Sequence, residues 1–281
     1  SWDQAIDEIG ARIRTIVARD GADAIAHLVG SAGGANLLAP MFRNAFYKAL
    51  GSRTMFGTGT CDTTNKFRVC EDMYGSPFQL SYPDVQRTQF LAVLGANPAV
   101  SGNTLYHLPH PVQRLKDIVR RGGRVVFVNP RRSESAQAGE HLFIRPDTDV
   151  FLLAAWCNEL IRTGGVARER VERYTKGFAE LQQTVADWTV ERQAAVTGVS
   201  AEALRDLVAS HRKAGGAGLY MATGVNQGRS GTLCFWLLEC INAISGNFDR
   251  AGGMLMGQGI VDMAGEVKRA GEVTLRHDRA D

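Results

Sequence analysis

The residues best suited to chemistry lie in short loops that follow predicted strands. Residues 95–98 combine a flexible glycine, the amide of Asn97, which can donate and accept hydrogen bonds, and a proline that fixes the exit from the strand. Residues 129–132 have the sequence Asn-Pro-Arg-Arg, and arginine binds phosphate through paired hydrogen bonds. Taken alone, the first loop is only a turn and the second is an ordinary solvated loop.

Two further segments carry polar groups at comparable positions. Asp149 follows a short predicted strand, where its carboxylate can accept hydrogen bonds from a guanine, although an acid at the start of a helix also has a simple structural reason to be there. The loop 223–231 is rich in glycine. The nicotinamide-type fingerprint GxGxxG is absent, because the glycines of residues 30–34 have a different spacing. Gly257 and Gly259 do not follow an obvious strand, and both these glycines and those of residues 30–34 are at least equally well explained as turns that need positive φ.

The elements that must position these loops follow from the apolar periodicity. Helices are predicted at residues 3–20, 37–50, 112–119, 149–162 and 232–244, and strands at residues 24–29, 90–94, 124–128, 142–144 and 219–222. Thr148 and Ser200 are predicted N-caps. Strands that alternate with helices through glycine turns favour an α/β fold with a doubly wound parallel sheet, in which ligands bind beyond the carboxyl ends of the strands. The unusual loops all fall at that edge.

Composition narrows the class of protein. The chain has 281 residues, 44% hydrophobic and 22% charged, enough for one large or two ordinary domains. The net charge is only +3 and no basic stripe occurs, so we expect no nucleic-acid partner. No apolar run reaches the roughly 18 to 20 residues of a membrane span, and Ser1 begins an amphipathic segment rather than a signal peptide.

The five cysteines form no CxxC pair and no zinc or iron–sulfur spacing. Cys157, Cys234 and Cys240 lie in apolar helical runs, so we expect them to pack in the core. Cys61 and Cys70 remain as candidates for chemistry.

An ordered series of motifs resembles the molybdopterin oxidoreductases of the dimethyl sulfoxide reductase family. It consists of LGANPAVSG at 94–102, GGRVVFVNPRRSESAQAGEHLFIRPDTD at 122–149, TGVNQGRSGTL at 223–233 and NAISGNFDRAGGML at 242–255. Family members typically show a GxNP turn, a strand ending in DPRRTxTA, an RPGTD turn, a GxNQ loop and an LTGNxGxxGG segment. The opening SWDQAI also resembles the family's SWDEAL helix, so the resemblance extends over about residues 1–265.

The resemblance implies a set of cofactor-binding residues. By the resemblance, a pterin or its phosphates would contact Gly95, Asn97 and Pro98. A guanosine pocket would be lined by Asn129, Pro130, Arg131 and Asp149. The other half of the same dinucleotide crevice would be lined by Gly224, Asn226 and Gln227. Two positions depart from the family pattern: Asn129 replaces an aspartate, and Asp147 replaces a glycine. Asn129 keeps an acceptor but lacks the charge, which weakens the expected contact with guanosine or ribose.

The resemblance also implies a domain organisation. We expect residues 1–70 to form part of a smaller α/β domain and residues 71–250 to form a Rossmann-like domain that binds a guanine dinucleotide pterin. Residues 251–281 are expected to be a segment returning to the smaller domain and a loose tail.

The implied activity is two-electron transfer of an oxygen atom or a hydride on a small substrate at molybdenum or tungsten. Two molybdopterin guanine dinucleotides would hold the metal, and the fragment alone would be inactive. Other parts of the same polypeptide would supply a 4Fe-4S cluster and a covering C-terminal domain, with an electron-transfer subunit as a possible partner. A non-catalytic scaffold homologue and a non-redox lyase stay open as alternatives. Either a cytoplasmic or a periplasmic bacterial location fits.

The protein ligand of the metal is expected in residues 57–75, GTGTCDTTNKFRVCEDMYG. Aligning Asp62 and Gly75 with the family places Arg68 at the usual ligand position, and an arginine cannot serve. Cys70, two residues away, is the first candidate for the metal ligand and catalytic residue, because a thiolate binds this metal strongly. Asp62, which follows Cys61, is the second candidate. A buried free cysteine and a loop cap are the alternative explanations of these two residues. Lys66 and Arg68 in the same segment could instead steer an anionic substrate or the pterin.

Overall fold

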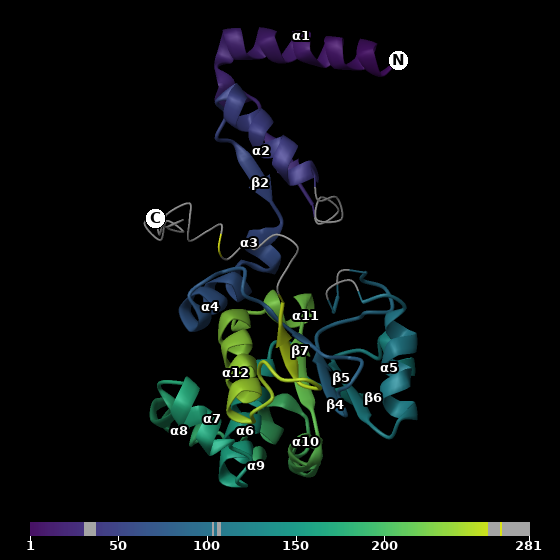
Figure 1. Cartoon of the computed structure of the whole chain (residues 1–281), viewed down its shortest axis with the longest axis vertical. Coiled ribbons are helices and arrows are strands. Elements are labelled where there is room, and N and C mark those ends of the chain that lie inside the picture. Colours follow the sequence, from purple (N-terminus) through teal and green to yellow (C-terminus); the bar gives the residue numbers. More distant parts are fainter. Residues whose placement is uncertain (31–37, 103, 106–107, 258–264, 266–281) are drawn as a thin grey trace. The chain divides into compact units, whose positions relative to one another are not determined.

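The computed structural model describes residues 1–30, 38–102, 104–105, 108–257 and 265 (Figure 1). The chain divides into two compact units, Ser1–Asp62, here called unit 1, and Thr63–Asp281, here called unit 2. The domain boundary expected at residue 70 falls inside helix α4 (Thr64–Tyr74), which packs against α12 (Gly231–Ile244) of unit 2. All of α4 therefore belongs to unit 2.

Unit 1 is a small α/β arrangement. Its elements are α1 (Trp2–Asp20), a 3-10 turn (Ala22–Ala24), β1 (His27–Val29), α2 (Leu38–Leu50), β2 (Met55–Gly57) and α3 (Gly59–Asp62). The Ser1 hydroxyl caps α1 by accepting from the backbone N–H of Gln4, and β1 pairs with β2 in parallel. The two helices predicted here are confirmed. The strand predicted at residues 24–29 is shorter, because residue 24 ends the 3-10 turn and the strand begins only at His27. Most of the glycine turn at 30–34 lies outside the described residues.

Unit 2 is built on a four-stranded parallel sheet in the order β6-β5-β4-β7. The strands are β4 (Phe90–Leu94), β5 (Arg124–Asn129), β6 (Glu140–Phe143) and β7 (Ala217–Met221). Phe90 lies opposite both Arg124 and Ala217, so β4 is hydrogen-bonded on both sides. The predicted parallel sheet is confirmed, although β6 and β7 each begin two residues earlier than expected.

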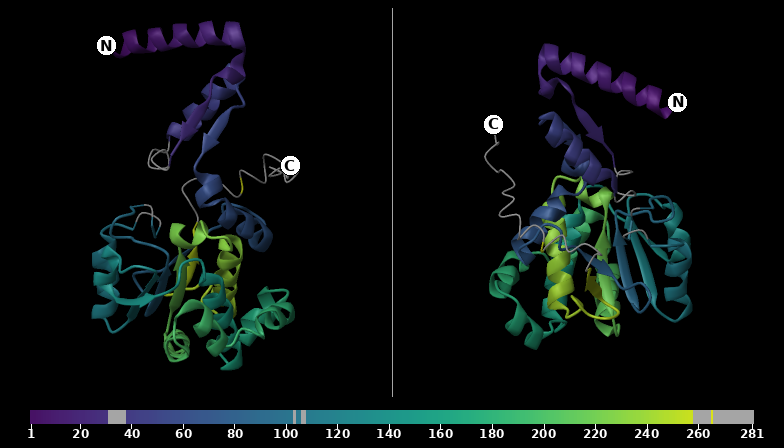
Figure 2. Two further views of the ribbon diagram at one scale, coloured as in Figure 1. Left: turned by 180° about the vertical axis from the view of Figure 1, so that it is seen from behind. Right: turned by 45° about the horizontal axis from the view of Figure 1, so that its top comes forward.

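Helices cover both faces of this sheet (Figure 2). Leu91 and Val93 of β4 pack with Leu115 and Ile118 of α5 (Pro111–Arg120). The alternate residues of β4 belong to a second cluster with α6 (Asp149–Arg162) and α12. Because strand side chains alternate between faces, this division is what a sheet buried on both sides requires.

The remaining elements of unit 2 complete the layers. They are β3 (Ser81–Pro83), a 3-10 turn (Glu134–Ala138), α7 (Arg168–Tyr174), α8 (Phe178–Val185), α9 (Val190–Thr197), α10 (Ala201–Lys213), α11 (Thr223–Asn226) and β8 (Met254–Met256). β8 pairs antiparallel with β3, inside unit 2, and all but one of the residues after 257 lie outside the described part.

The two predicted helix caps have different outcomes. Ser200 accepts from the backbone N–H of Ala203 and caps α10, as predicted. Thr148 occupies the predicted N-cap position of α6, but its hydroxyl donates to the carbonyl of Arg145 at 2.7 Å and makes no capping bond to the helix. The preceding turn has a carbonyl within reach of the hydroxyl, which competes with the helix.

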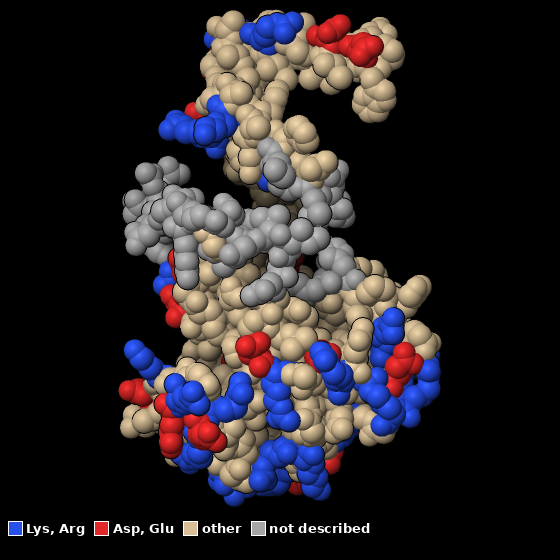
Figure 3. All heavy atoms as spheres, in the orientation of Figure 1, with Lys and Arg blue, Asp and Glu red and all other residues tan. Residues whose placement is uncertain are grey.

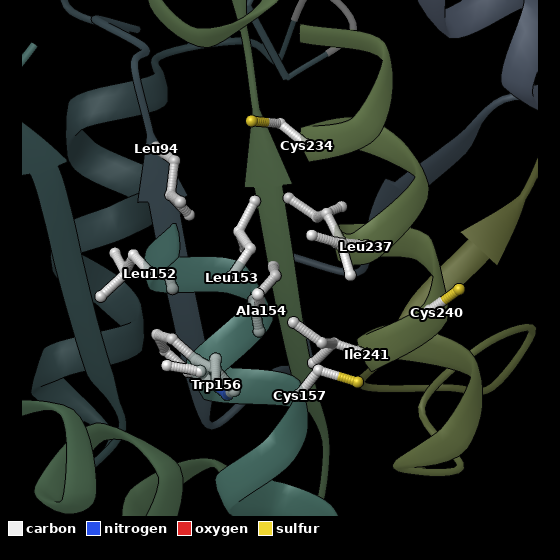
Figure 4. Packing of buried hydrophobic residues seen from close by; sticks show 14 of the residues in the cluster. Leu94, Leu152, Leu153, Ala154, Trp156, Cys157, Cys234, Leu237, Cys240 and Ile241 are labelled. Carbon is white, nitrogen blue, oxygen red and sulfur yellow. The ribbon is translucent and has the colours of Figure 1, made fainter. Parts of the chain in front are cut away.

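The larger core lies between α6, α12 and the sheet (Figure 4). Leu153 of α6 lies toward Leu237 of α12 in that view, whereas Trp156 donates from its ring to His211 of α10. The cysteines that were expected to pack, Cys157, Cys234 and Cys240, are buried in the same cluster, which confirms the expectation. Burial raises the pKa of each thiol, so these side chains are neutral packing groups.

Candidate functional site

The site begins where the strand order reverses. After β4 the chain adds β5 and β6 on one side, and β7 then returns to the other side of β4. The loops that follow β4 and β7 therefore emerge next to each other at the carboxyl edge of the sheet, the usual place for a ligand in such folds.

Two glycines let these loops touch. Gly95 has a φ of 59°, and its carbonyl accepts from the backbone N–H of Gly224 at 2.9 Å. A Cβ added to Gly95 would lie 2.7 Å from the backbone nitrogen of Val225, and one added to Gly224 would lie 2.8 Å from the Gly95 carbonyl oxygen. Both predicted positions thus require glycine, and the structure brings them together.

The loops after β4 and β5 are joined by Asn97. Its Oδ1 accepts from the hydroxyl of Ser135 at 2.6 Å, and its Nδ2 donates to Glu134 at 2.6 Å. Asn129 is buried and donates from Nδ2 to the carbonyl of Ala96 at 3.4 Å. The amide of Asn97 therefore positions the two loops in this structure. Pro98, the next residue, is buried.

Arg131 lies at the surface beside exposed Pro130, with 65% of its side chain accessible. It forms an ion pair with Glu134 at 3.2 Å. Hydrogen bonds from the backbone N–H of Glu134 itself, from Arg131 and from Asn97 lower the pKa of the Glu134 carboxyl to about 2. Glu134 was not predicted from the sequence, although it lies inside the motif that carries Arg131.

A cavity of about 370 Å³ opens between the N-terminal ends of α6 and α12. Its lining includes Asp147, Asp149, Gly224, Gln227, Ser230 and Gly231. Three of the predicted residues, Asp149, Gly224 and Gln227, therefore share one cavity. The lining does not include Asn129, Pro130, Arg131 or Asn226.

Asp149 is the buried acid of this cavity. It is the first residue of α6, and burial raises the pKa of its carboxyl to about 6, with the charge of Asp147 adding to the shift. A helix N-terminus favours a negative charge, but here loss of water outweighs that effect. A ligand with N–H donors would restore the carboxylate.

Asp147 explains why an acid can replace the family's glycine. Its φ is 62°, in the left-handed region, which aspartate adopts more readily than most residues. Its carboxylate accepts from the backbone N–H of Arg229 at 2.9 Å, and a Cβ on Gly228 would lie 2.6 Å from the same oxygen. Asp147 therefore links the turn before α6 to the loop before α12, a role the sequence did not suggest.

Asn226 lies just outside the cavity lining and is buried. Its carbonyl accepts from Nδ2 of Asn65 at 2.9 Å. Its side-chain Oδ1 is also buried and finds no hydrogen-bond partner within the described part of the chain. Buried acceptors are normally satisfied, so this atom is suited to a ligand donor.

The two candidate metal ligands belong to different units. Cys70 lies in α4 and is fully buried among the core side chains, and burial raises the pKa of its thiol to about 12. Asp62 ends α3 and is half-buried. The side chain of Cys61 lies outside the described residues. Where side chains are described, no group of three or more His, Cys, Asp or Glu could hold a metal ion by itself.

None of the helices that the structure describes is both long and apolar enough to span a membrane.

The chain is similar in sequence and in fold to known enzymes. The chain is 24% identical to formate dehydrogenase H of Escherichia coli over 89% of its own length and 34% of that protein. It is 28% identical to the thiosulfate reductase molybdopterin-containing subunit PhsA of Salmonella typhimurium over 90% of its own length and 32% of that protein. The structure resembles acetylene hydratase from Pelobacter acetylenicus with a TM-score of 0.74 and 23% identity, over 92% of this chain and 34% of that one.

The chain thus spans about a third of the length of these relatives. The family model for molybdopterin oxidoreductase matches residues 1–279, nearly the whole sequence. The motifs, the parallel sheet and the glycine contact at its carboxyl edge agree with this match. The chain belongs to the molybdopterin oxidoreductases of the dimethyl sulfoxide reductase family.

Proposed function

We propose that this chain is the central, cofactor-holding part of a molybdenum or tungsten oxidoreductase. The whole protein would carry two guanine dinucleotide pterins and move an oxygen atom or a hydride, with two electrons, on a small substrate. The observation that supports this most is the cavity in which Asp149, Gly224 and Gln227 meet at the crossover of the parallel sheet. We interpret that sheet as a Rossmann-like dinucleotide-binding domain.

The residues of the site fit such a cofactor. The cavity of about 370 Å³ falls within the usual range for small-molecule pockets, and the N-termini of α6 and α12 border it, where phosphate binds well. Gly95 and Gly224 leave room for close backbone approach. The unpaired Oδ1 of Asn226 offers a buried acceptor beside the same loop.

The residues divide the work of binding. The carboxylate of Asp149 would accept hydrogen bonds from the N–H groups of guanine, and Arg131 would exchange its ion pair with Glu134 for a phosphate. Asn97 and Asp147 would hold the loops in place. When bound, the pterin-held metal supplies the two-electron chemistry.

The protein ligand of that metal stays a prediction, with Cys70 before Asp62. A soft thiolate suits the metal, but the burial of Cys70 in α4 opposes the thiolate form. Coordination by Cys70 would require α4 to shift, whereas Asp62 ends a short helix at the edge of unit 1.

The full-length protein can also be used to test the two alternative functions, a non-catalytic scaffold and a non-redox lyase. A scaffold homologue would contain no metal, and a lyase would turn over without an electron acceptor. The similarity of the chain to acetylene hydratase is the reason to measure turnover without an electron acceptor. For the whole protein, the proposal includes a further segment that carries a 4Fe-4S cluster and an electron-transfer subunit as partner.

The deciding experiment uses the full-length protein. Metal content and released guanine nucleotide are measured for the wild type, Arg131→Ala and the exposed control Arg173→Ala. We expect metal and nucleotide in the wild type, and about a tenfold or greater loss of pterin retention in Arg131→Ala, since a charge-assisted hydrogen bond is lost. A wild type without guanine nucleotide contradicts the proposed function, and unchanged retention in Arg131→Ala contradicts the assignment of Arg131.

A further inference from the structure

Lys66 is the one Lys or Arg side chain that is buried in the described part of the chain, with 7% of its surface accessible. Removing an ammonium group from water is costly unless its surroundings compensate. A lysine kept in such a place therefore calls for a reason beyond packing.

The groups around Lys66 are ones that stabilise a positive charge. Its Nζ donates to the carbonyl of Met221 at 2.6 Å and lies 5.3 Å from the ring centre of Tyr220 and 5.2 Å from that of Phe235. Burial raises the pKa of the Glu239 carboxyl, and the charge of Lys66 acts in the opposite direction. Carbonyl oxygen, aromatic faces and a nearby carboxyl group are all partners of a cation.

The position of Lys66 links it to the cofactor loop. Met221 ends β7, and α11 follows directly. The neighbouring residue, Asn65, donates to the carbonyl of Asn226 at the other end of α11. The first turn of α4 thus holds both ends of the segment that carries Gly224 and the unpaired Oδ1 of Asn226.

The carboxyl edge of the sheet needs positive charge if an anionic cofactor is to bind there. The cavity carries two acids, Asp147 and Asp149, whereas the proposed cofactor is itself anionic. Arg131 and Arg229 are 65% and 94% exposed, so water and salt screen them. A buried cation is screened far less.

We propose that Lys66 is a positioning residue that fixes the start of the cofactor loop and supplies the buried positive charge against which the anionic pterin cofactor is held. This inference rests on the proposed function. A positive charge also favours the more reduced state of a redox centre bound at that edge, so Lys66 would shift the reduction potential of the metal to a more positive value.

The test compares Lys66→Met, Lys66→Arg and the exposed control Lys176→Met in the full-length enzyme. Pterin content after dialysis, the midpoint potential of the metal and the unfolding temperature of the cofactor-free protein are measured. Methionine fills a similar volume without charge but leaves the buried carbonyl of Met221 without its donor, so we expect the unfolding temperature of the cofactor-free protein to fall modestly. Pterin retention should fall by about tenfold, and the potential should shift negative. Lys66→Arg should restore both properties, and Lys176→Met should change neither.

Different results would contradict the role of Lys66 and the proposed function of the protein. A Lys66→Met protein with wild-type retention and potential overturns the role of Lys66, whereas a wild type without pterin overturns the proposed function as well. A Lys66→Met protein that is less stable without cofactor but keeps the wild-type potential shows a purely structural lysine, which also overturns the inference. If Lys66→Met does not fold, Lys66→Gln replaces it, and the proposal then requires that only the arginine variant keeps the wild-type potential.

Discussion

Gly95 and Asp147 both have a positive φ at the edge of the site, for different physical reasons. Gly95 needs to lack a side chain because the loop after β7 lies against it. Asp147 has a side chain that binds the backbone of Arg229, which offsets its unfavourable conformation. The left-handed conformation is thus tolerated at position 95 because there is no side chain, and at position 147 because the side chain forms a hydrogen bond.

Gly95→Ala should therefore be much more destabilising than Gly122→Ala. Gly122 also has a positive φ, of 85°, but an added Cβ there meets nothing within 4 Å. We expect Gly122→Ala to lower the free energy of unfolding by about 1 kcal/mol and Gly95→Ala by roughly 2 to 4 kcal/mol, since overpacking adds to the conformational penalty. Urea unfolding measures both. Equal losses would mean that the contact with Val225 is not tight.

Asp149 should make stability depend on pH. Its pKa in the folded chain, about 6, lies above the ordinary value of 3.8, so the stability it contributes is complete below pH 3.8 and is lost as the pH rises through 6. Asp149→Asn removes this dependence. We expect the difference in unfolding free energy between the wild type and Asp149→Asn to change by roughly 3 kcal/mol between acidic and neutral pH.

The comparison with Asp149→Asn is needed because His211 acts in the opposite direction. Burial lowers the pKa of His211 to about 4, so its contribution is present above the ordinary value of 6.5 and is lost as the pH falls toward 4. His211 is common to both proteins and cancels in the difference. A difference that does not vary with pH would contradict the buried state of Asp149.

At the scale of elements, a buried carboxyl group joins α4, β3 and α12. Glu239 of α12 accepts from the Tyr74 hydroxyl at 2.7 Å and from the Ser81 hydroxyl at 2.8 Å. Burial raises the pKa of both Glu239 and Tyr74. These bonds hold in place the helix that also carries Lys66 and Cys70.

Tyr74→Phe should weaken this junction without changing the packing of the ring on Phe248, whose centre is 5.1 Å away. We expect the free energy of unfolding to fall by about 1 to 2 kcal/mol, because a buried acceptor loses its donor. Tyr174→Phe, at a tyrosine that is 67% exposed, is the control and should change stability by less than about 0.5 kcal/mol. Thermal or urea unfolding distinguishes them, and equal effects would contradict the role of the Tyr74 hydroxyl.

The sequence predicted elements better than contacts. The strand at residues 90–94 and the helix at residues 149–162 were found with the observed bounds, because apolar periodicity and glycine turns are local signals. The contacts of Lys66 with Met221 and of Asp147 with Arg229 were not predicted, since each joins residues far apart in the sequence. The amide of Asn97 was expected to meet the cofactor, but its partners, Glu134 and Ser135, become visible only in the fold.

At the scale of the whole molecule, the two units differ in how completely they bury their apolar surface. Unit 2 has a large core, and charges of both signs are mixed over the face that Figure 3 shows. In unit 1, α1 buries none of its residues, and Trp2 is 85% exposed. Large exposed apolar groups in a row indicate a surface that other parts of a protein cover.

The chain alone should therefore show no turnover. It spans about a third of its relatives, and the proposed second pterin and cluster would lie in other parts of the polypeptide. The purified chain and the full-length protein, both supplied with metal and cofactor, are compared in one assay with formate, nitrate and thiosulfate. Activity of the chain above background would contradict this prediction.

Because β4 lies inside the sheet, its two edges need two partner strands, and these strands are synthesised at different times. β5 is synthesised soon after β4, but the other neighbour of β4, β7, follows only after residues 130–216 have been translated. Until then one edge of an apolar strand has no partner, and open strand edges promote aggregation. We therefore expect the yield of folded protein to depend on translation speed and on chaperones that shield this edge.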